Sequence, residues 1–185
     1  NIWHILKDAV SEKIQGRGSR IVVGDSKKLY QQKTGLKFLE EAVLSFIWHT
    51  KGPVTKFSDL LKLLSEYDEG VFDKYPWYKG KDLDLPVASN VSAIMNYADN
   101  FRHTAALQDV TVLEIKSHFL CVSEINRQIE LDGNKSLLLF KSCIRHLKEI
   151  FEHYGKHEPK VLIDKHGGRN YYEGLLAQDF EGCKV

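Results

Sequence analysis

The sequence has few cysteines, almost no net charge and no long apolar run. Its cysteines, Cys121, Cys143 and Cys183, are odd in number and lack C-x-x-C spacing, which disfavours zinc and indicates reduced thiols in a cytoplasmic protein. Basic residues exceed acidic ones by only 26 − 25 = 1. Any nucleic-acid surface must therefore be local, as at Lys27-Lys28. No apolar stretch approaches the roughly 20 residues of a membrane span, so we expect no membrane partner.

A chain of 185 residues is long enough for one domain with a substantial core, and we expect residues 1–185 to form a single domain. Helix and strand patterns alternate towards the C-terminal end, which predicts a helix-rich α/β fold. Ser123 is expected to cap a short helix over 124–127. The expected helices are 2–14, 36–47, 57–64, 91–101, 136–154 and 171–179, and the expected strands are 21–23, 110–121 and 160–164.

The most informative stretch begins with the apolar run 161–163, which predicts a buried central strand. Asp164 ends this strand, at the edge where open α/β sheets bind their ligands. Gly167 and Gly168 let backbone N–H groups approach an anion, and Arg169 can pair with phosphate through two hydrogen bonds. The alternative is that Asp164 only caps the following helix.

Three windows occur in an order that resembles one family. They are Gly-Asp-Ser-Lys-Lys-Leu at 24–29, Val-Ser-Glu-Ile-Asn-Arg at 122–127 and Val-Leu-Ile-Asp at 161–164. This arrangement resembles the type 2 ribonucleases H, of which ribonuclease HII is the best-known kind. The resemblance extends over about residues 20–165 and implies a ribonuclease-H-like mixed sheet flanked by helices.

The resemblance also implies an activity, a metal and a set of site residues. Family members are metal-dependent endonucleases that hydrolyse the RNA strand of RNA–DNA hybrids. Their carboxylates hold two Mg²⁺ or Mn²⁺ ions, hard cations that take carboxylate and phosphate oxygens. By position, Asp164 would be catalytic as a metal ligand. The expected substrate-binding residues are Asp25, Ser26, Lys27, Lys28, Asn126, Arg127, Gly167, Gly168 and Arg169.

Each of these assignments has a structural alternative. Asp25 and Ser26 are residue types that cap turns and helices. Asn126 and Arg127 fit a hydrogen bond at a helix start and a solvated charge. The aromatic residues between 72 and 78 could stack on bases, or could bury one another and so hold their loop to the body of the protein.

The sequence departs from the family's pattern in its carboxylates. An adjacent Asp-Glu pair on a first strand has no counterpart, and Asp179 and Glu181 match the last catalytic Asp only by default. We therefore expect a chain that is incomplete at both ends and inactive by itself, and we interpret Gly16-Arg17-Gly18 as a coincidental match to the family's substrate loop. The alternatives are a non-catalytic nucleic-acid-binding or protein-interaction domain with this fold, and an unrelated α/β protein.

Overall fold

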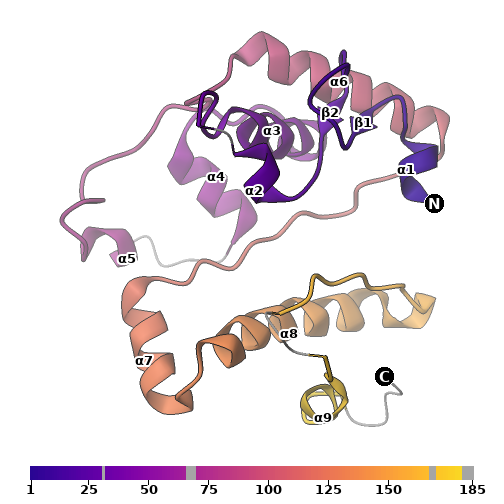
Figure 1. The fold of residues 1–185 in the computed structure, drawn as a ribbon. Helices are drawn as coiled ribbons and strands as arrows, with labels where there is room; N and C mark the ends of the chain where they lie inside the picture. Colours follow the sequence, from indigo (N-terminus) through magenta and orange to yellow (C-terminus); the bar gives the residue numbers. More distant parts are fainter. Residues whose placement is uncertain (31, 66–69, 167–169, 181–185) are drawn as a thin grey trace. The chain divides into compact units, whose positions relative to one another are not determined.

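The computed structural model describes residues 1–30, 32–65, 70–166 and 170–180. It divides into two compact units, Asn1–Ser117 and His118–Val185 (Figure 1). Helices predominate in both units, and the only sheet among the described residues has two parallel strands, so the helix-rich part of the predicted fold class is confirmed. None of the helices in the described ranges is both long and apolar enough to cross a membrane. The expectation of a single domain stays a prediction.

The first segment of unit 1 is a short helix followed by a strand, not the predicted helix over 2–14. Helix α1 spans Ile2–Ile5, and the chain then turns into strand β1 at Val10–Ser11. Strand β2, Ile21–Val22, lies where a strand was predicted and pairs with β1 in parallel. The apolar residues in this segment have helical spacing, but Leu6, Ala9 and Val10 are buried although they lie in a turn and a strand. Their spacing therefore led to a wrong prediction of a helix.

Four of the remaining helices of unit 1 follow β2 in turn: α2 (Ser26–Leu29), α3 (Lys37–Lys51), α4 (Phe57–Leu64) and α5 (Gly70–Asp73). Helix α6 spans Val91–Leu107. The predictions for α3, α4 and α6 are confirmed, and α3 ends at Gly52 with a φ of 87°, a value that favours glycine. The helical spacing of apolar residues does not fix which face of α3 is buried, since Val43 is 47% exposed while Glu41 is buried.

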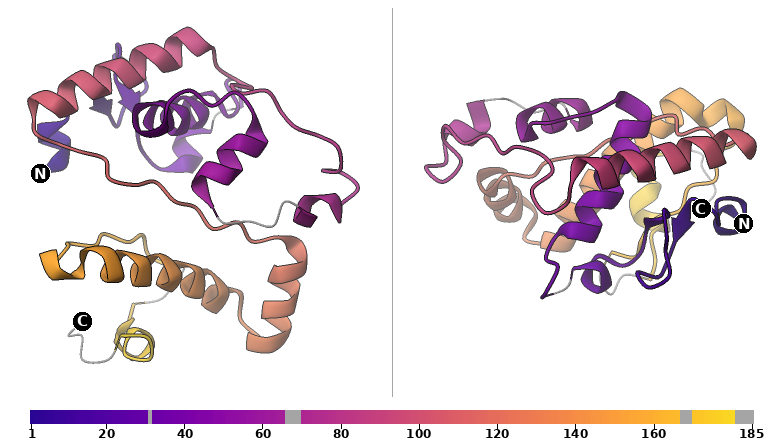
Figure 2. Two further views of the ribbon diagram at one scale, coloured as in Figure 1. Left: turned by 180° about the vertical axis from the view of Figure 1, so that it is seen from behind. Right: turned by 90° about the horizontal axis from the view of Figure 1, so that it is seen from above.

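Packing of α3 against α6 forms the centre of unit 1 (Figure 2). Leu44, Ile47 and Trp48 of α3 contact Ile94 and Ala98 of α6 in the largest apolar cluster, which Leu60 of α4 completes. A second cluster joins Phe101 of α6 to Ile21 of β2 and to Leu6 beyond α1. The core of unit 1 therefore lies between two long helices, and the small sheet lies at its side.

Residues 110–121 do not form the predicted strand, because no ladder of hydrogen bonds pairs them with another described strand. Their β-branched residues lie in extended chain, and Ile115 packs against the core of unit 1. The backbone N–H of Ser117 donates to the carbonyl of Leu64. The alternating apolar residues of this segment thus hold it to unit 1 through individual contacts and not through a sheet.

Unit 2 is built on two consecutive helices, α7 (Val122–Asp132) and α8 (Lys135–Tyr154). Cys121, not Ser123, occupies the N-cap position of α7, and Asn134 caps α8 through its side chain. The one-turn 3-10 helix η1 follows α8 at Gly155–His157, and α9 (Glu173–Leu176) is a single turn within the predicted helix 171–179. The helix predicted over 136–154 is confirmed.

The predicted strand over 160–164 is wrong. These residues run as extended chain back alongside α8 (Figures 1 and 2), and no strand in the described part of unit 2 pairs with them. Leu162 is 81% exposed, whereas a central strand would bury it. An apolar run becomes a buried strand only where neighbouring strands accept its backbone hydrogen bonds, and unit 2 presents helices instead.

A buried ion pair fastens the loop between β1 and β2 to α3. The guanidinium of Arg17 donates to Glu41 over 2.6 Å, with side chains 14% and 2% exposed. The same guanidinium lies over the rings of Phe38 and Tyr97, at 5.0 and 4.8 Å from their centroids. The hydroxyl of Ser89 donates to the second oxygen of Glu41, so both oxygens of this buried carboxylate are engaged.

We predict that Arg17→Ala lowers the free energy of unfolding of unit 1 by about 3–5 kcal/mol, because it leaves the Glu41 carboxylate buried without a cation. Chemical denaturation followed by circular dichroism measures the change. Arg102→Ala is the matched control: Arg102 pairs with Asp99 on the surface, where such a pair contributes at most about 1 kcal/mol. Equal effects of the two substitutions would contradict the prediction.

Candidate nucleic-acid interface

The D-S-K-K-L box, residues 25–29, consists of the N-cap residue of α2 and the four residues of this one-turn helix. The carboxylate of Asp25 caps α2 by accepting the backbone N–H of Lys27 over 2.8 Å. Leu29 is buried beside Val22 and Phe38, which fixes the turn to unit 1. Asp25, Ser26, Lys27 and Lys28 are all exposed. Burial of Leu29 thus anchors the box to unit 1, and the cationic side chains of Lys27 and Lys28 are exposed to solvent.

The structure supports the capping interpretation of Asp25 directly. Its side chain makes the hydrogen bond that an N-cap residue makes to the second helical position. A capping role does not prevent the following lysines from contacting phosphate, since the side chains of Lys27 and Lys28 are exposed. Asp25 is therefore a positioning residue in this geometry.

Asn126 and Arg127 lie on the first turns of α7, and both side chains are exposed. They belong to unit 2, as Asp164 does, whereas the D-S-K-K-L box belongs to unit 1. Among the described residues of unit 2, Asp164 hydrogen-bonds to its neighbour Lys165 and not to Asn126 or Arg127. The structure thus shows these predicted site residues on separate segments.

Asp164 lies on an exposed segment, and its carboxylate accepts the backbone N–H of the adjacent Lys165 over 2.8 Å. It does not cap the next helix, whose N-cap residue is Tyr172. Both earlier interpretations of its environment, a strand end and a helix cap, are therefore wrong. Gly167, Gly168 and Arg169 lie outside the described residues.

The segment around Asp164 is anchored to α8 by aromatic contacts. The backbone N–H of His166 donates to the Tyr172 hydroxyl over 2.9 Å, and the rings of His166 and Tyr172 both pack against Phe140. Phe140 is buried on α8. These contacts fix the two ends of the loop from 166 to 172 and leave Asp164 just outside it.

The residues present do not by themselves fit a two-metal centre. Such a centre needs several carboxylates within ligand distance of both ions. Across the described ranges, no three His, Cys, Asp or Glu side chains lie together as a metal would require. Asp179, a default candidate for the last carboxylate, pairs with Lys148 over 2.7 Å instead.

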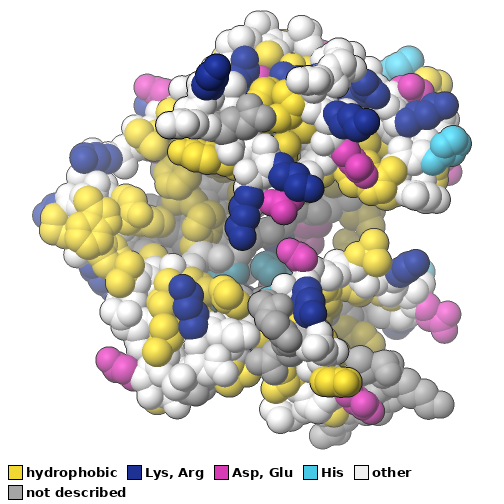
Figure 3. Space-filling view, viewed as in Figure 1, with side chains coloured by type: hydrophobic (Ala, Val, Ile, Leu, Met, Phe, Trp, Pro, Cys, Tyr) yellow, Lys and Arg dark blue, Asp and Glu magenta, His cyan; other side chains and the backbone are white. Residues whose placement is uncertain are grey.

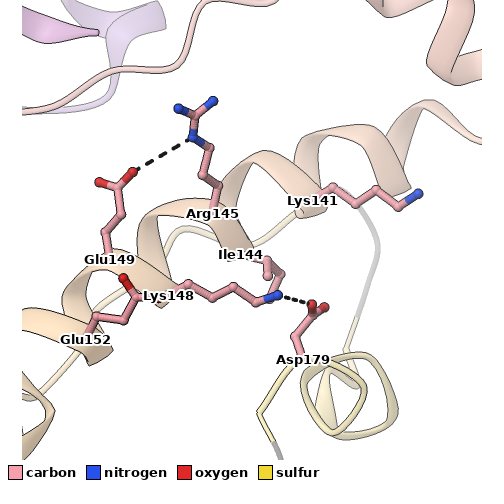
Figure 4. A pocket seen from close by; sticks show the side chains of 7 residues that line it. All are labelled: Lys141, Ile144, Arg145, Lys148, Glu149, Glu152 and Asp179. Carbon is pink, nitrogen blue, oxygen red and sulfur yellow. Dashed lines mark ion pairs between the residues drawn. The ribbon is translucent and has the colours of Figure 1, made fainter. Parts of the chain in front are cut away.

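Helix α8 carries a basic row that the sequence analysis did not single out. Lys141, Arg145 and Lys148 are spaced four and three residues apart, so they share one helix face, and they line a hollow of about 440 Å³ (Figure 4). Figure 4 shows Lys148 directed at Asp179 and Arg145 directed at Glu149. The two ion pairs measure 2.7 Å from the Lys148 Nζ atom to Asp179 and 3.8 Å from the Arg145 Nε atom to Glu149. The spacing of these three basic residues can be read from the sequence, but acidic residues after them on the same helix hide the pattern.

Burial beside this row lowers the pKa of His118, and the positive charge of Arg145 lowers it further. The Nδ1 atom of His118 has no hydrogen-bond partner within the described part of the chain. Burial and the neighbouring cation thus both favour the neutral form of His118.

Comparison with known protein families, with curated proteins and with solved structures finds no match to this chain.

We predict that Asp25→Ala accelerates amide hydrogen exchange at Lys27 about fivefold, because loss of an N-cap acceptor costs about 1 kcal/mol. Asp25→Asn keeps a side-chain oxygen and should exchange close to the natural rate. Exchange measured by NMR at pH 7 distinguishes the two variants. An Asn variant as fast as the Ala variant would mean that the charge of Asp25, not its hydrogen bond, holds the turn.

Proposed function

We propose that this chain belongs to a metal-dependent endonuclease of the type 2 ribonuclease H kind, which hydrolyses the RNA strand of RNA–DNA hybrids. The observation that carries the proposal is the D-S-K-K-L box, displayed on an exposed turn with Leu29 buried beneath it. If the box served only for packing, we would expect more of its residues than Leu29 to be buried. Here the four residues before it face solvent, where a nucleic acid could reach them.

In this proposal, Lys27 and Lys28 bind phosphates of the hybrid. Lysine ammonium groups neutralise phosphate charge and release counterions, which gives affinity without sequence preference. On α8, Arg145 and Lys148 pair with Glu149 and Asp179, so the basic row is assigned no phosphate contact. Asn126 and Arg127, exposed on α7, are proposed to contact the substrate as well.

The proposal gives Asp164 the role of one metal ligand in the natural protein. Mg²⁺ or Mn²⁺ would there activate water and stabilise the leaving oxygen of the phosphodiester. Because the described residues do not assemble the other ligands, no step of hydrolysis is assigned to them. The proposed ribonuclease-H-like fold rests on the order of the three sequence windows.

A second candidate function is nucleic-acid binding without cleavage. The position of Asp164 favours it, since its carboxylate lies on an exposed segment and accepts its neighbour's backbone N–H. Both candidates share the phosphate contacts of Lys27 and Lys28, and they differ in what Asp164 does. Binding and cleavage are therefore tested separately.

We predict that replacing Lys27 and Lys28 with Ala weakens hybrid binding by the same factor for all sequences. Loss of two phosphate contacts should also lower the slope of log affinity against log salt by about 2, or roughly 1 per lysine. Fluorescence anisotropy with labelled RNA–DNA hybrids between 50 and 200 mM salt, a range within which such contacts are measurable, gives both quantities.

The matched control replaces Lys7 and Lys13, two exposed lysines of unit 1 that precede β2. It removes the same charge and should leave the slope nearly unchanged. If both double variants change the slope equally, Lys27 and Lys28 act only through the total charge of the chain.

We predict that Asp164→Asn in the natural protein reduces hybrid cleavage at least a hundredfold while leaving hybrid affinity and melting temperature unchanged. Loss of one ligand charge removes metal stabilisation worth several kcal/mol, and the exposed side chain contributes little to packing. Cleavage rates with Mg²⁺ and with Mn²⁺ measure the effect, with the exposed Glu130→Gln of α7 as control. Full activity of Asp164→Asn with both metals would rule out the ligand role.

A further inference from the structure

Unit 1 contains a groove between α4 and the segment that follows α5. Its volume is about 560 Å³, within the range of small-molecule sites. Aromatic and charged side chains line the groove together. They include Phe72, Trp77, Tyr78, Lys62, Lys81 and Asp82. Figure 3 shows hydrophobic side chains gathered over the α5 end of unit 1, with basic side chains beside them.

The aromatic side of the groove is a fixed platform. Phe72 and Tyr78 meet edge to face with centroids 5.3 Å apart, and Tyr75 contacts both Trp77 and Tyr78. Rings that pack against one another lose their freedom before any ligand arrives. Even so, Trp77 remains 56% exposed and Tyr78 49% exposed, so the loop does not bury its rings on the body of the protein.

The two walls of the groove are tied together. The carboxylate of Asp82 accepts the backbone N–H and the hydroxyl of Ser58, over 2.9 and 2.8 Å, at the start of α4. The backbone N–H of Phe57 donates to the carbonyl of Leu83 over 2.9 Å. These bonds join residues about 25 positions apart in the sequence and set the width of the groove.

The groove sets an exposed cation, Lys81, beside flat apolar rings. Hydrogen bonds from Ser58 hold the pKa of the Asp82 carboxyl below its ordinary value, so this carboxylate is engaged in holding the wall. Lys81 supplies an exposed cation, and Lys62 and Asp73 also line the groove. An aromatic floor with cationic side chains matches a nucleobase and its phosphate.

We propose that this groove binds one unpaired base of a single-stranded nucleic acid, stacked on Trp77 with its phosphate at Lys81. Bases of a duplex are already stacked on each other, so only an unpaired base can use the rings. The site lies on α4 and the segment after α5, apart from the D-S-K-K-L box on α2. It therefore does not depend on hydrolysis of hybrids.

The test compares two single-stranded oligonucleotides of 12 nucleotides, one of uridines and one abasic with the same phosphates. We expect the natural chain to bind the uridine strand about 5- to 100-fold more tightly, the range that stacking of a base on an aromatic ring provides. Trp77→Ala should remove this preference, and Trp77→Phe should retain part of it. Lys81→Ala should weaken both strands equally and lower the salt slope by roughly 1.

Trp3→Ala is the matched control, because Trp3 is a partly exposed tryptophan of α1 and does not line the groove. It should keep the preference for the uridine strand. Equal affinity of the natural chain for both strands would overturn the proposal, as would Trp77→Phe and Trp77→Ala both binding like the natural chain. The proposal would also be overturned if tetramethylammonium or an aromatic peptide bound in the groove while the uridine strand did not bind there.

Discussion

The pairing of Glu41 with Arg17 is the contact on which the organisation of unit 1 depends. Glu41 lies inside α3, and its carboxylate is buried, so it is tolerated only because a cation and a hydroxyl meet both of its oxygens. The cation comes from the loop between β1 and β2, and the hydroxyl comes from Ser89, just before α6. One buried charge therefore joins three segments that are distant in the sequence.

The neighbouring Glu40 extends the same arrangement. Its two carboxylate oxygens accept the backbone N–H groups of Val87, Ala88 and Ser89. A loop with three consecutive N–H groups on one carboxylate has few other conformations, so the entry into α6 is fixed. The packing of α6 on α3 follows from this entry point as much as from the apolar residues between them.

The candidate phosphate site is linked to this centre by packing. Arg17 lies over the ring of Phe38, and Phe38 forms an apolar cluster with Leu29, the last residue of the D-S-K-K-L box. Lys27 and Lys28 are therefore supported by a chain of contacts that begins at Glu41. The aromatic groove is linked to α3 through α4, since Leu60 of α4 belongs to the same core cluster as Trp48 of α3.

The parts of the fold that the sequence predicted correctly are the parts decided locally. Helices α3, α4, α6 and α8 carry apolar residues at helical spacing, and Gly52 and Asn134 mark helix ends. Whether the run 161–163 becomes a strand depends instead on a partner elsewhere in the chain, and its composition carries no information about that partner. The same limit applies to the aromatic groove, where the bonds from Ser58 to Asp82 define a wall that neither segment reveals by itself.

The formal charge of +1 understates how much positive charge unit 1 presents to a ligand. Several carboxylates accept hydrogen bonds from within unit 1: Glu40 from three backbone N–H groups, Glu41 from Arg17, and the exposed Asp82 from Ser58. Hydrogen-bond donors aimed at a carboxylate offset its charge locally, whereas Lys27, Lys28 and Lys81 extend into solvent. A near-neutral chain can therefore offer local basic surfaces because its acids hold the fold together while these lysines remain on the outside.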